Sequence, residues 1–110
     1  MMTWTLDEAV DVIRKIQPIV RALDYHCVLG GGVLNKGFST KDLDLFFLKL
    51  NGSTGERYHE LFIYLGQIFG TLEPIRDSPD YIAGEPWHYR EMIYGLYMGK
   101  RVDIFIQGQP

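Results

Sequence analysis

The sequence predicts an α/β (α+β) domain, in which segments of helical and strand character alternate along the chain. Its 110 residues, 46% of them hydrophobic, are enough for one core, so residues 1–110 are expected to form a single domain. Two segments carry apolar side chains at helical spacing. Two apolar runs and a C-terminal pair of segments rich in β-forming residues predict the strands.

The first predicted helix follows a capping-box pattern. Thr5 and Glu8 stand at the spacing of that motif, and apolar residues then recur at helical intervals as far as Ile16. Pro18 lacks a backbone donor and clashes with the preceding turn, so it predicts a kink or break. A second short helical piece is expected over residues 19–23.

The first predicted strand covers residues 26–29, and a glycine triplet follows it directly. Gly30, Gly31 and Gly32 are compatible with a tight turn that needs positive φ. They are also compatible with a backbone that a phosphate approaches closely, with N–H groups of the next helical turn as donors. The triplet alone favours a plain turn. Its position between a core strand and a strand with paired aspartates favours the phosphate-binding interpretation.

The aspartates Asp42 and Asp44 stand at i and i+2 at the start of an apolar strand, after a polar connection over residues 36–41. Residues two apart on a strand share one face, so both carboxylates are expected to point the same way. Two adjacent carboxylates repel each other and resist desolvation unless a cation lies between them. The pair therefore predicts a metal site.

A second helix is predicted after a second capping-box pattern, from Ser53 to Glu56. Its apolar stripe indicates a core-facing helix that ends at Gly70; the stripe consists of Tyr58, Leu61, Phe62, Leu65, Ile68 and Phe69. Residues 72–75 predict a short edge strand, because they include Pro74. Turn residues follow at 77–80 and 84–86, and either an active-site flap or a plain connection fits residues 71–88.

The C-terminal segment predicts a β-hairpin, with arms at 87–97 and 101–106 and a turn at 98–100. Asp103 is the acidic residue of an otherwise apolar second arm, where an unpaired charge costs several kcal/mol. Arg101 shares its face by parity, whereas Lys100 does not. A salt bridge and a metal site are equally compatible with this spacing.

Composition limits the function classes. A net charge of −3 argues against tight non-specific nucleic-acid binding, but not against a nucleotide that arrives with its own metal. Cys27 is the single cysteine, which excludes an internal disulfide framework. No signal peptide and no apolar run of membrane-spanning length is visible, so a cytoplasmic protein without membrane contact is expected. His26, His59 and His88 lack metal-ligand spacing and are expected at the core edge or surface.

Three features in order resemble the nucleotidyltransferase superfamily to which DNA polymerase β belongs. They are the glycine turn after Leu29, the Asp-x-Asp pair in Lys41-Asp42-Leu43-Asp44-Leu45, and the single carboxylate in Val102-Asp103-Ile104. The resemblance spans residues 29–106. The stretch from Lys41 to Leu45 is especially similar to the strand of CCA-adding and antibiotic-modifying members.

This resemblance implies a nucleotidyltransferase-like catalytic lobe, with a mixed sheet, helices mainly on one face and the aspartates clustered at one end of adjacent strands. It implies an enzyme that moves a nucleoside monophosphate from an NTP to a hydroxyl acceptor with Mg²⁺ or Mn²⁺. Asp42 and Asp44 would bind the metal that carries the triphosphate. Together with Asp103 they would also bind the metal that activates the acceptor. Gly30, Gly31, Gly32 and Lys41 would contact the nucleotide, while solvated surface is an equally good interpretation for Lys41. The same two interpretations apply to further cationic or aromatic candidates: Lys36, Tyr89, Arg90 and Arg101.

Two departures from the family pattern bear on the acceptor. CCA-adding members have an Arg-Asp pair where this chain has Leu34-Asn35, which weakens a tRNA assignment. A helical domain after the third carboxylate is also missing, so a small substrate, a second protomer or a partner protein is expected to complete the site. An RNA end, a small molecule and a protein all stay open as acceptors, as does the choice of NTP.

Two alternatives to catalysis follow from the same residues. A non-catalytic, antitoxin-like module could retain the fold and bind nucleotide, metal or a partner protein. The carboxylates could instead be purely structural, with the glycines serving only as a turn. Mg²⁺-dependent NTP binding separates this last possibility from the other two, and turnover separates the enzyme from the binding module.

Overall fold

A computed structural model of the chain describes residues 3–75 and 89–108. The predicted turns at 77–80 and 84–86, together with Trp87 and His88, lie outside these residues. The helices are α1 (Leu6–Ala22), α2 (Gly31–Lys36) and α3 (Tyr58–Phe69). The strands are β1 (Trp4–Thr5), β2 (Tyr25–Gly30), β3 (Phe38–Ser39), β4 (Leu43–Lys49), β5 (Glu73–Pro74), β6 (Tyr89–Tyr97) and β7 (Lys100–Gln107).

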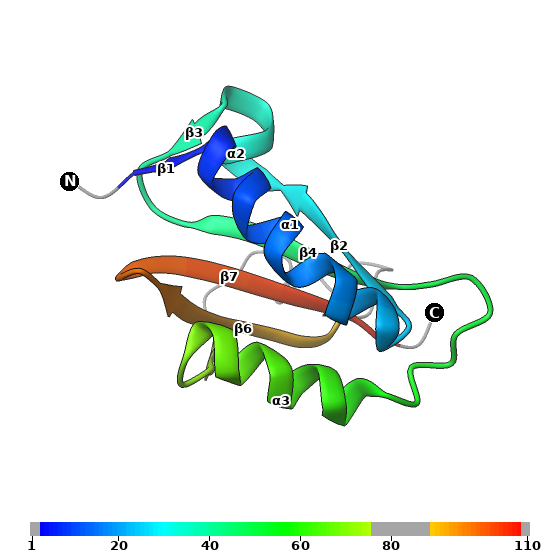
Figure 1. Cartoon of the computed structure of the whole chain (residues 1–110). Coiled ribbons are helices and arrows are strands. Elements are labelled where there is room, and N and C mark those ends of the chain that lie inside the picture. Colours follow the sequence, from blue (N-terminus) through cyan, green and yellow to red (C-terminus); the bar gives the residue numbers. More distant parts are fainter. Residues whose placement is uncertain (1–2, 76–88, 109–110) are drawn as a thin grey trace.

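The predicted α+β class and mixed sheet are confirmed. Five strands form the main sheet in the order β2-β4-β7-β6-β5, and β1 pairs separately with β3. The central pair β4–β7 is parallel, whereas the other neighbours in the main sheet are antiparallel. Figure 1 shows α1 and α3 on the same side of this sheet, with α1 beside β2 and α3 beside β6. One face of the sheet is therefore covered by helices.

Alternate residues of the two central strands form the core face of the sheet. They are Leu43, Leu45 and Phe47 of β4 and Val102, Ile104 and Ile106 of β7, all fully buried. Because side chains alternate along a strand, Asp44 and Asp103 belong to the opposite face. Burial of the apolar set thus fixes the strand register and, with it, the direction in which these carboxylates point.

Helix α1 begins at the predicted capping box but does not break at Pro18. Glu8 N donates to Thr5 Oγ1 at 3.2 Å, and Thr5 N donates to Glu8 Oε1 at 3.0 Å. The helix continues through Pro18 to Ala22 as one element, so the prediction of a break was wrong. Because Pro18 has no N–H, the Arg14 carbonyl lacks its helical hydrogen bond. Both residues lie on the exposed side of the helix, where water can bind that carbonyl.

The capping box gives a first prediction. Thr5→Ala removes the hydroxyl that accepts from Glu8 N, so it is expected to lower the free energy of unfolding by about 1 kcal/mol in urea titrations. Thr40→Ala is the matched control, because Thr40 is exposed and precedes no helix. Equal effects of the two substitutions would show that the cap contributes nothing.

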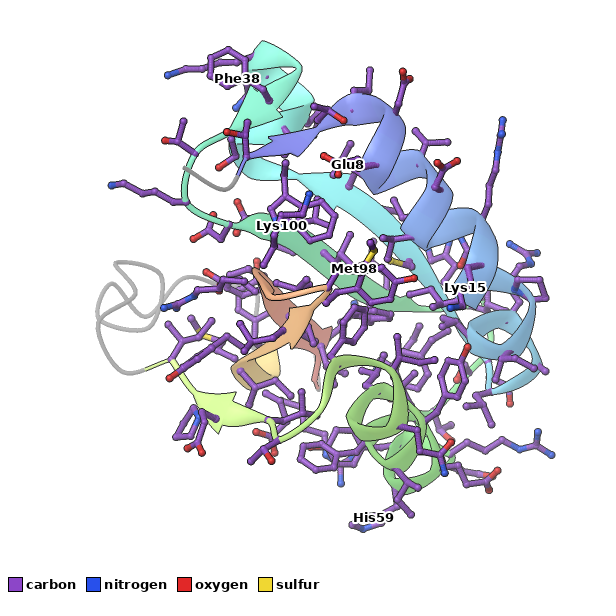
Figure 2. All side chains as sticks on the ribbon, turned by 60° about the vertical axis from the view of Figure 1, so that its left-hand side comes forward. Glu8, Lys15, Phe38, His59, Met98 and Lys100 are labelled. Carbon is purple, nitrogen blue, oxygen red and sulfur yellow. The ribbon has the colours of Figure 1, made fainter. Side chains whose placement is uncertain are left out.

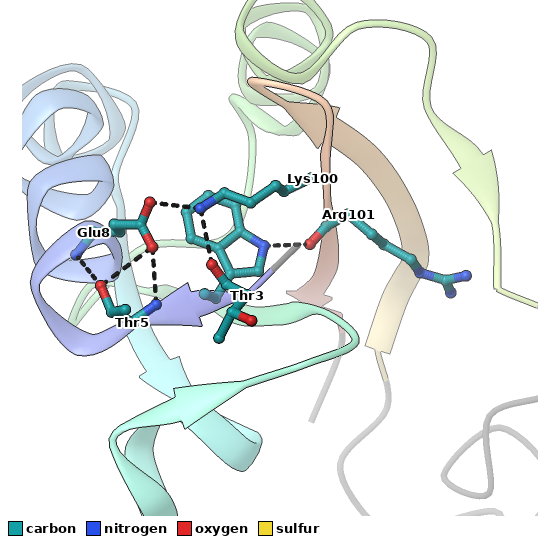
Figure 3. Close-up of polar contacts among 6 residues, drawn as sticks. Thr3, Thr5, Glu8, Lys100 and Arg101 are labelled. Atoms are coloured by element: carbon teal, nitrogen blue, oxygen red, sulfur yellow. Dashed lines mark hydrogen bonds and ion pairs between the residues drawn. The ribbon is translucent and has the colours of Figure 1, made fainter. Parts of the chain in front are cut away.

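The N-terminal segment is tied to the start of β7 by side chains. Lys100 Nζ lies 2.5 Å from Glu8 Oε2 and 3.1 Å from Thr3 O, and the buried Trp4 donates from Nε1 to Arg101 O at 2.8 Å (Figure 3). Lys100 also lies over the Trp4 ring, 4.2 Å from its centroid. These contacts hold the first turn of α1 against the strand that carries Asp103.

Helix α3 has the predicted core stripe but not the predicted start. It begins at Tyr58, and its N-cap residue Arg57 makes no side-chain capping bond, so the Ser53–Glu56 capping box was wrong. Ser53 Oγ instead accepts from Gly55 N at 3.2 Å, and Gly55 takes φ +78°, which ends the turn before a helix can form. The predicted stop at Gly70 is confirmed.

The predicted edge strand and C-terminal hairpin are both confirmed. β5 lies at the edge of the sheet, and β6 pairs with β7 around a tight turn in which Met98 and Gly99 take φ of +52° and +77°. Positive φ at both central residues is the usual geometry of a two-residue hairpin turn. Within the described residues, the helices are all too short or too polar to cross a membrane.

Candidate metal centre

The fold brings the three predicted aspartates together. One carboxylate oxygen from each of Asp42, Asp44 and Asp103 lies within 4.8 Å of the others. Asp44 and Asp103 are direct neighbours in the parallel β4–β7 pair, and Asp42 stands two residues before Asp44. Asp103 is 7% exposed, whereas the other two are half-buried. The cluster therefore opens to solvent on the side of Asp42 and Asp44.

A turn stabilised by the Ser39 side chain positions the backbone of Asp42. Ser39 Oγ accepts from Lys41 N and from Asp42 N, each at 3.2 Å. These bonds satisfy backbone donors just before β4 begins and hold the chain as it turns into the strand. Ser39 was not among the residues predicted for the site, although a Ser two or three residues before a carboxylate is the signal of such a turn.

Arg101 is a cation in direct contact with the cluster. Its Nε donates to Asp103 Oδ1 at 2.6 Å, and its guanidinium lies over the Tyr94 ring, 4.1 Å from the centroid. The pKa of Asp103 is raised to about 6. Burial is the largest cause and the negative charge of Asp42 adds to it, whereas the Arg101 hydrogen bond lowers the pKa. The salt bridge considered from the sequence is thus present, and the same carboxylate also belongs to the aspartate cluster.

The glycine turn packs directly against Asp44. Gly30 ends β2 opposite Asp44, and Gly31 opens α2 with φ +66°. A Cβ added at Gly31 would overlap the Asp44 carboxylate, and one added at Gly30 would lie 2.9 Å from Phe46 Cδ1. Gly32 has no such constraint, since its nearest neighbours lie at 3.7 Å. The close approach of the backbone to the Asp44 carboxylate therefore requires glycine at 31. The Phe46 ring restricts residue 30, and residue 32 tolerates other side chains.

The other candidates from the sequence are distributed over the molecule. Lys41 precedes Asp42 but is exposed, and no contact with another described residue holds its side chain at the cluster. Tyr89 and Arg90 lie at the opposite end of the sheet, where Tyr89 pairs with Gln107. Lys36 is exposed at the end of α2. His59 points away from the sheet on α3 (Figure 2), which agrees with its expected surface position.

The residues present fit a hard divalent cation. Mg²⁺ and Mn²⁺ prefer carboxylate oxygens, and this cluster offers one such oxygen from each of three side chains. The missing Cβ of Gly31 leaves room for the Asp44 carboxylate beside the turn. Arg101 already offsets part of the negative charge, so a cation would compete with or supplement that ion pair.

The raised pKa of Asp103 gives a second prediction, for protein in metal-free buffer. Between pH 4 and about 6 the unfolded chain releases the Asp103 proton while the folded protein retains it. The free energy of unfolding should therefore fall by about 1–3 kcal/mol as the pH rises through this interval. Urea titrations from pH 4 to 8 measure the change. Asp103→Asn cannot ionise and should lose this part of the slope; an identical slope in both proteins would contradict the assignment.

Comparison with known proteins does not add a family to these observations. No protein-family model matches the chain, and no curated protein sequence matches it significantly. Any functional assignment therefore depends on the residues themselves: Asp44 and Asp103 on two paired strands, Asp42 directly before the first of them, Arg101 on the Asp103 carboxylate, and the glycine turn against Asp44.

Proposed function

We propose that this protein is a metal-dependent nucleotidyltransferase that moves a nucleoside monophosphate from an NTP to a hydroxyl acceptor. The observation that carries the proposal is the meeting of Asp42, Asp44 and Asp103 within 4.8 Å beside a glycine turn. Three clustered carboxylates are costly without a cation, because their charges repel and one of them is buried. Their combination with a close-approaching backbone suits a substrate that arrives as a metal–triphosphate complex.

The residues would divide the work by position. A divalent cation, when bound, would neutralise charge on the transferred phosphoryl group and lower the pKa of the acceptor hydroxyl. Asp42 and Asp44, on the open side, would hold the cation that accompanies the triphosphate, and Asp103 would join them in holding the second. Backbone N–H groups of the glycine turn would donate to the terminal phosphates. Arg101 would hold the Asp103 carboxylate in one orientation through its 2.6 Å bond.

One contact favours a second candidate, a non-catalytic nucleotide- or partner-binding module. The Arg101–Asp103 ion pair offsets the buried charge without any metal, which is what a structural carboxylate needs. In that case Mg²⁺-NTP would bind through Asp42 and Asp44, and nothing would be transferred. The two candidates differ in turnover and not in binding.

A labelling assay tests the proposal. Purified protein is incubated with Mg²⁺ or Mn²⁺, each α-labelled NTP, and separately with total RNA, cell protein and small-molecule extract. Label transfer is expected with the wild type, to be abolished by EDTA, and to fall about a hundredfold or more in Asp44→Asn. Asp11→Asn is the control, because Asp11 is an exposed carboxylate on α1, an element that carries none of the three clustered aspartates.

The outcome separates the candidates. The labelled fraction identifies the acceptor class as RNA, protein or small molecule. Mg²⁺-dependent NTP binding without transfer would favour the binding module. If isothermal titration detects no Mg²⁺-dependent NTP binding, the enzyme and the nucleotide-binding module both fail, and the argument for a metal site is wrong.

A further inference from the structure

A pocket of about 410 Å³ lies at the end of the sheet opposite the aspartates. Its lining includes Tyr25 at the start of β2, Lys49 at the end of β4, Gly55, and Arg90 on β6. Lys49 stands five residues after Asp44 on the same strand, which corresponds to roughly 17 Å at the rise of a β-strand. The pocket is therefore separate from the aspartate cluster, and its volume is in the range of small-molecule sites.

The hydroxyl of Tyr25 is the most unusual group in this pocket. Tyr25 is 1% exposed, yet no other described residue forms a hydrogen bond with its Oη. A Cβ added at Gly55 would lie 3.0 Å from this oxygen, so the glycine keeps the space beside it open. Burial raises the pKa of Tyr25, so the hydroxyl stays protonated and can donate. The hydroxyl is therefore a donor on the wall of the pocket, where a ligand can accept its proton.

Two cations face the same space. The Arg90 guanidinium lies 3.7 Å from the centroid of the Tyr58 ring, and Tyr58 is itself fixed by a 2.6 Å hydrogen bond from its Oη to Glu91 Oε1. Stacking holds the plane of the guanidinium but leaves its N–H edges unused by other described residues. The aliphatic stem of Lys49 passes Gly55, with Cδ 3.3 Å from the position of an added Cβ. None of the described lining residues is acidic.

From this arrangement we infer that the pocket binds a small phosphate monoester. The phosphate accepts from Tyr25 Oη and from the Arg90 guanidinium, with the Lys49 ammonium as the second positive charge. A phosphate monoester carries a charge close to −2 at neutral pH, which balances the charge of two cations. A single carboxylate carries a charge of only −1 and would balance one of them. A bare phosphate leaves most of the volume empty, so an organic group occupies the remainder beside the Tyr25 and Tyr89 rings.

The test is a ¹H–¹⁵N NMR titration of the full chain with phenyl phosphate as the probe. Saturable shifts are expected at the amides of Tyr25, Gly55 and Gly108, which line the pocket, and not at Gly30–Gly32. Benzyl alcohol of similar size should not bind, and benzoate should bind more weakly than phenyl phosphate. Shifts confined to the glycine turn, or equal affinity for benzoate, would overturn the inference.

Four variants make the test specific. Tyr25→Phe removes only the hydroxyl and should raise the Kd for phenyl phosphate about three- to tenfold. Arg90→Gln should raise it at least about tenfold, because it removes a charge-assisted bond. Arg14→Gln, an exposed arginine on α1, is the matched control and should leave the Kd unchanged, as should Asp42→Asn. Spectral dispersion reports whether each variant is folded, and unchanged affinity in folded Tyr25→Phe and Arg90→Gln would overturn the assignment.

Discussion

Gly31→Ala is expected to abolish Mn²⁺ binding at the aspartate cluster and to lower the free energy of unfolding by more than about 2 kcal/mol. Two effects combine at this residue. Its φ of +66° is strained for any residue with a Cβ, and the added methyl group would overlap the Asp44 carboxylate. Relief of the overlap moves the carboxylate away from Asp42 and Asp103. Electron paramagnetic resonance of Mn²⁺ titrations measures the binding, and urea titrations measure the stability.

Gly37→Ala separates strain from overlap. Gly37 has a similar φ of +82°, but an added Cβ there meets nothing within 4 Å. Its alanine variant should therefore lose only about 1–2 kcal/mol of unfolding free energy and retain Mn²⁺ binding. If both variants bind Mn²⁺ as the wild type does, the contact between the glycine turn and Asp44 has no role in the metal centre.

Gly95→Ala is expected to destabilise the protein by about 3 kcal/mol, because it forces α3 away from the sheet. An added Cβ would lie 2.5 Å from Phe69 O and 2.9 Å from Phe69 Cβ. Phe69 is 1% exposed and is the last residue of α3, so its backbone has little freedom to yield. Thermal and urea denaturation measure the loss.

Gly66→Ala is the matched control and should have the opposite sign. Gly66 lies within α3, and an added Cβ there meets nothing within 4 Å. Alanine stabilises a helix interior by about 0.5–1 kcal/mol relative to glycine, so this variant should be more stable than the wild type. A neutral or stabilising effect of Gly95→Ala would show that α3 does not depend on this close contact.

The part of the site that lies on one strand could be predicted from the sequence. Alternation alone places Asp42 and Asp44 on one face, and the apolar residues between and after them indicate which face is buried. The order of the glycine turn, the aspartate pair and the third carboxylate along the chain could also be seen in the sequence. Local pattern could not supply the β4–β7 pairing that sets Asp103 beside Asp44, because nothing local to either strand determines its distant neighbour; only the family resemblance implied that the aspartates cluster.

Local patterns misled where a single residue dominated the expectation. Pro18 predicts a break from its own chemistry, but its exposed position near the helix end lets water replace the missing bond. Ser53 and Glu56 match a capping box, but Gly55 between them adopts a positive φ that a helix start excludes. In both cases the outcome depends on the backbone path and the solvent exposure of the site, which a short motif does not contain.

The Tyr25 pocket could not be predicted, since its residues share no spacing in the sequence. Tyr25, Lys49 and Arg90 are brought together by the antiparallel β2–β4 pair and by the distant β6 strand. Each residue taken alone suggests core or solvated surface. The position of the Tyr25 hydroxyl on a pocket wall becomes visible only when its surroundings are known.

The parallel pairing of β4 with β7 also has a consequence for how the protein folds. β6 and β7 form a hairpin, and β2 and β4 are joined through the short α2 segment, so each pair can form from neighbouring chain. The β4–β7 contact instead closes a loop of more than half the chain, which is entropically costly and slow. The aspartates are divided between these two local units. A metal held by all three aspartates, as proposed above, would therefore bind only after the long loop has closed. It would retard unfolding without guiding the early steps of folding.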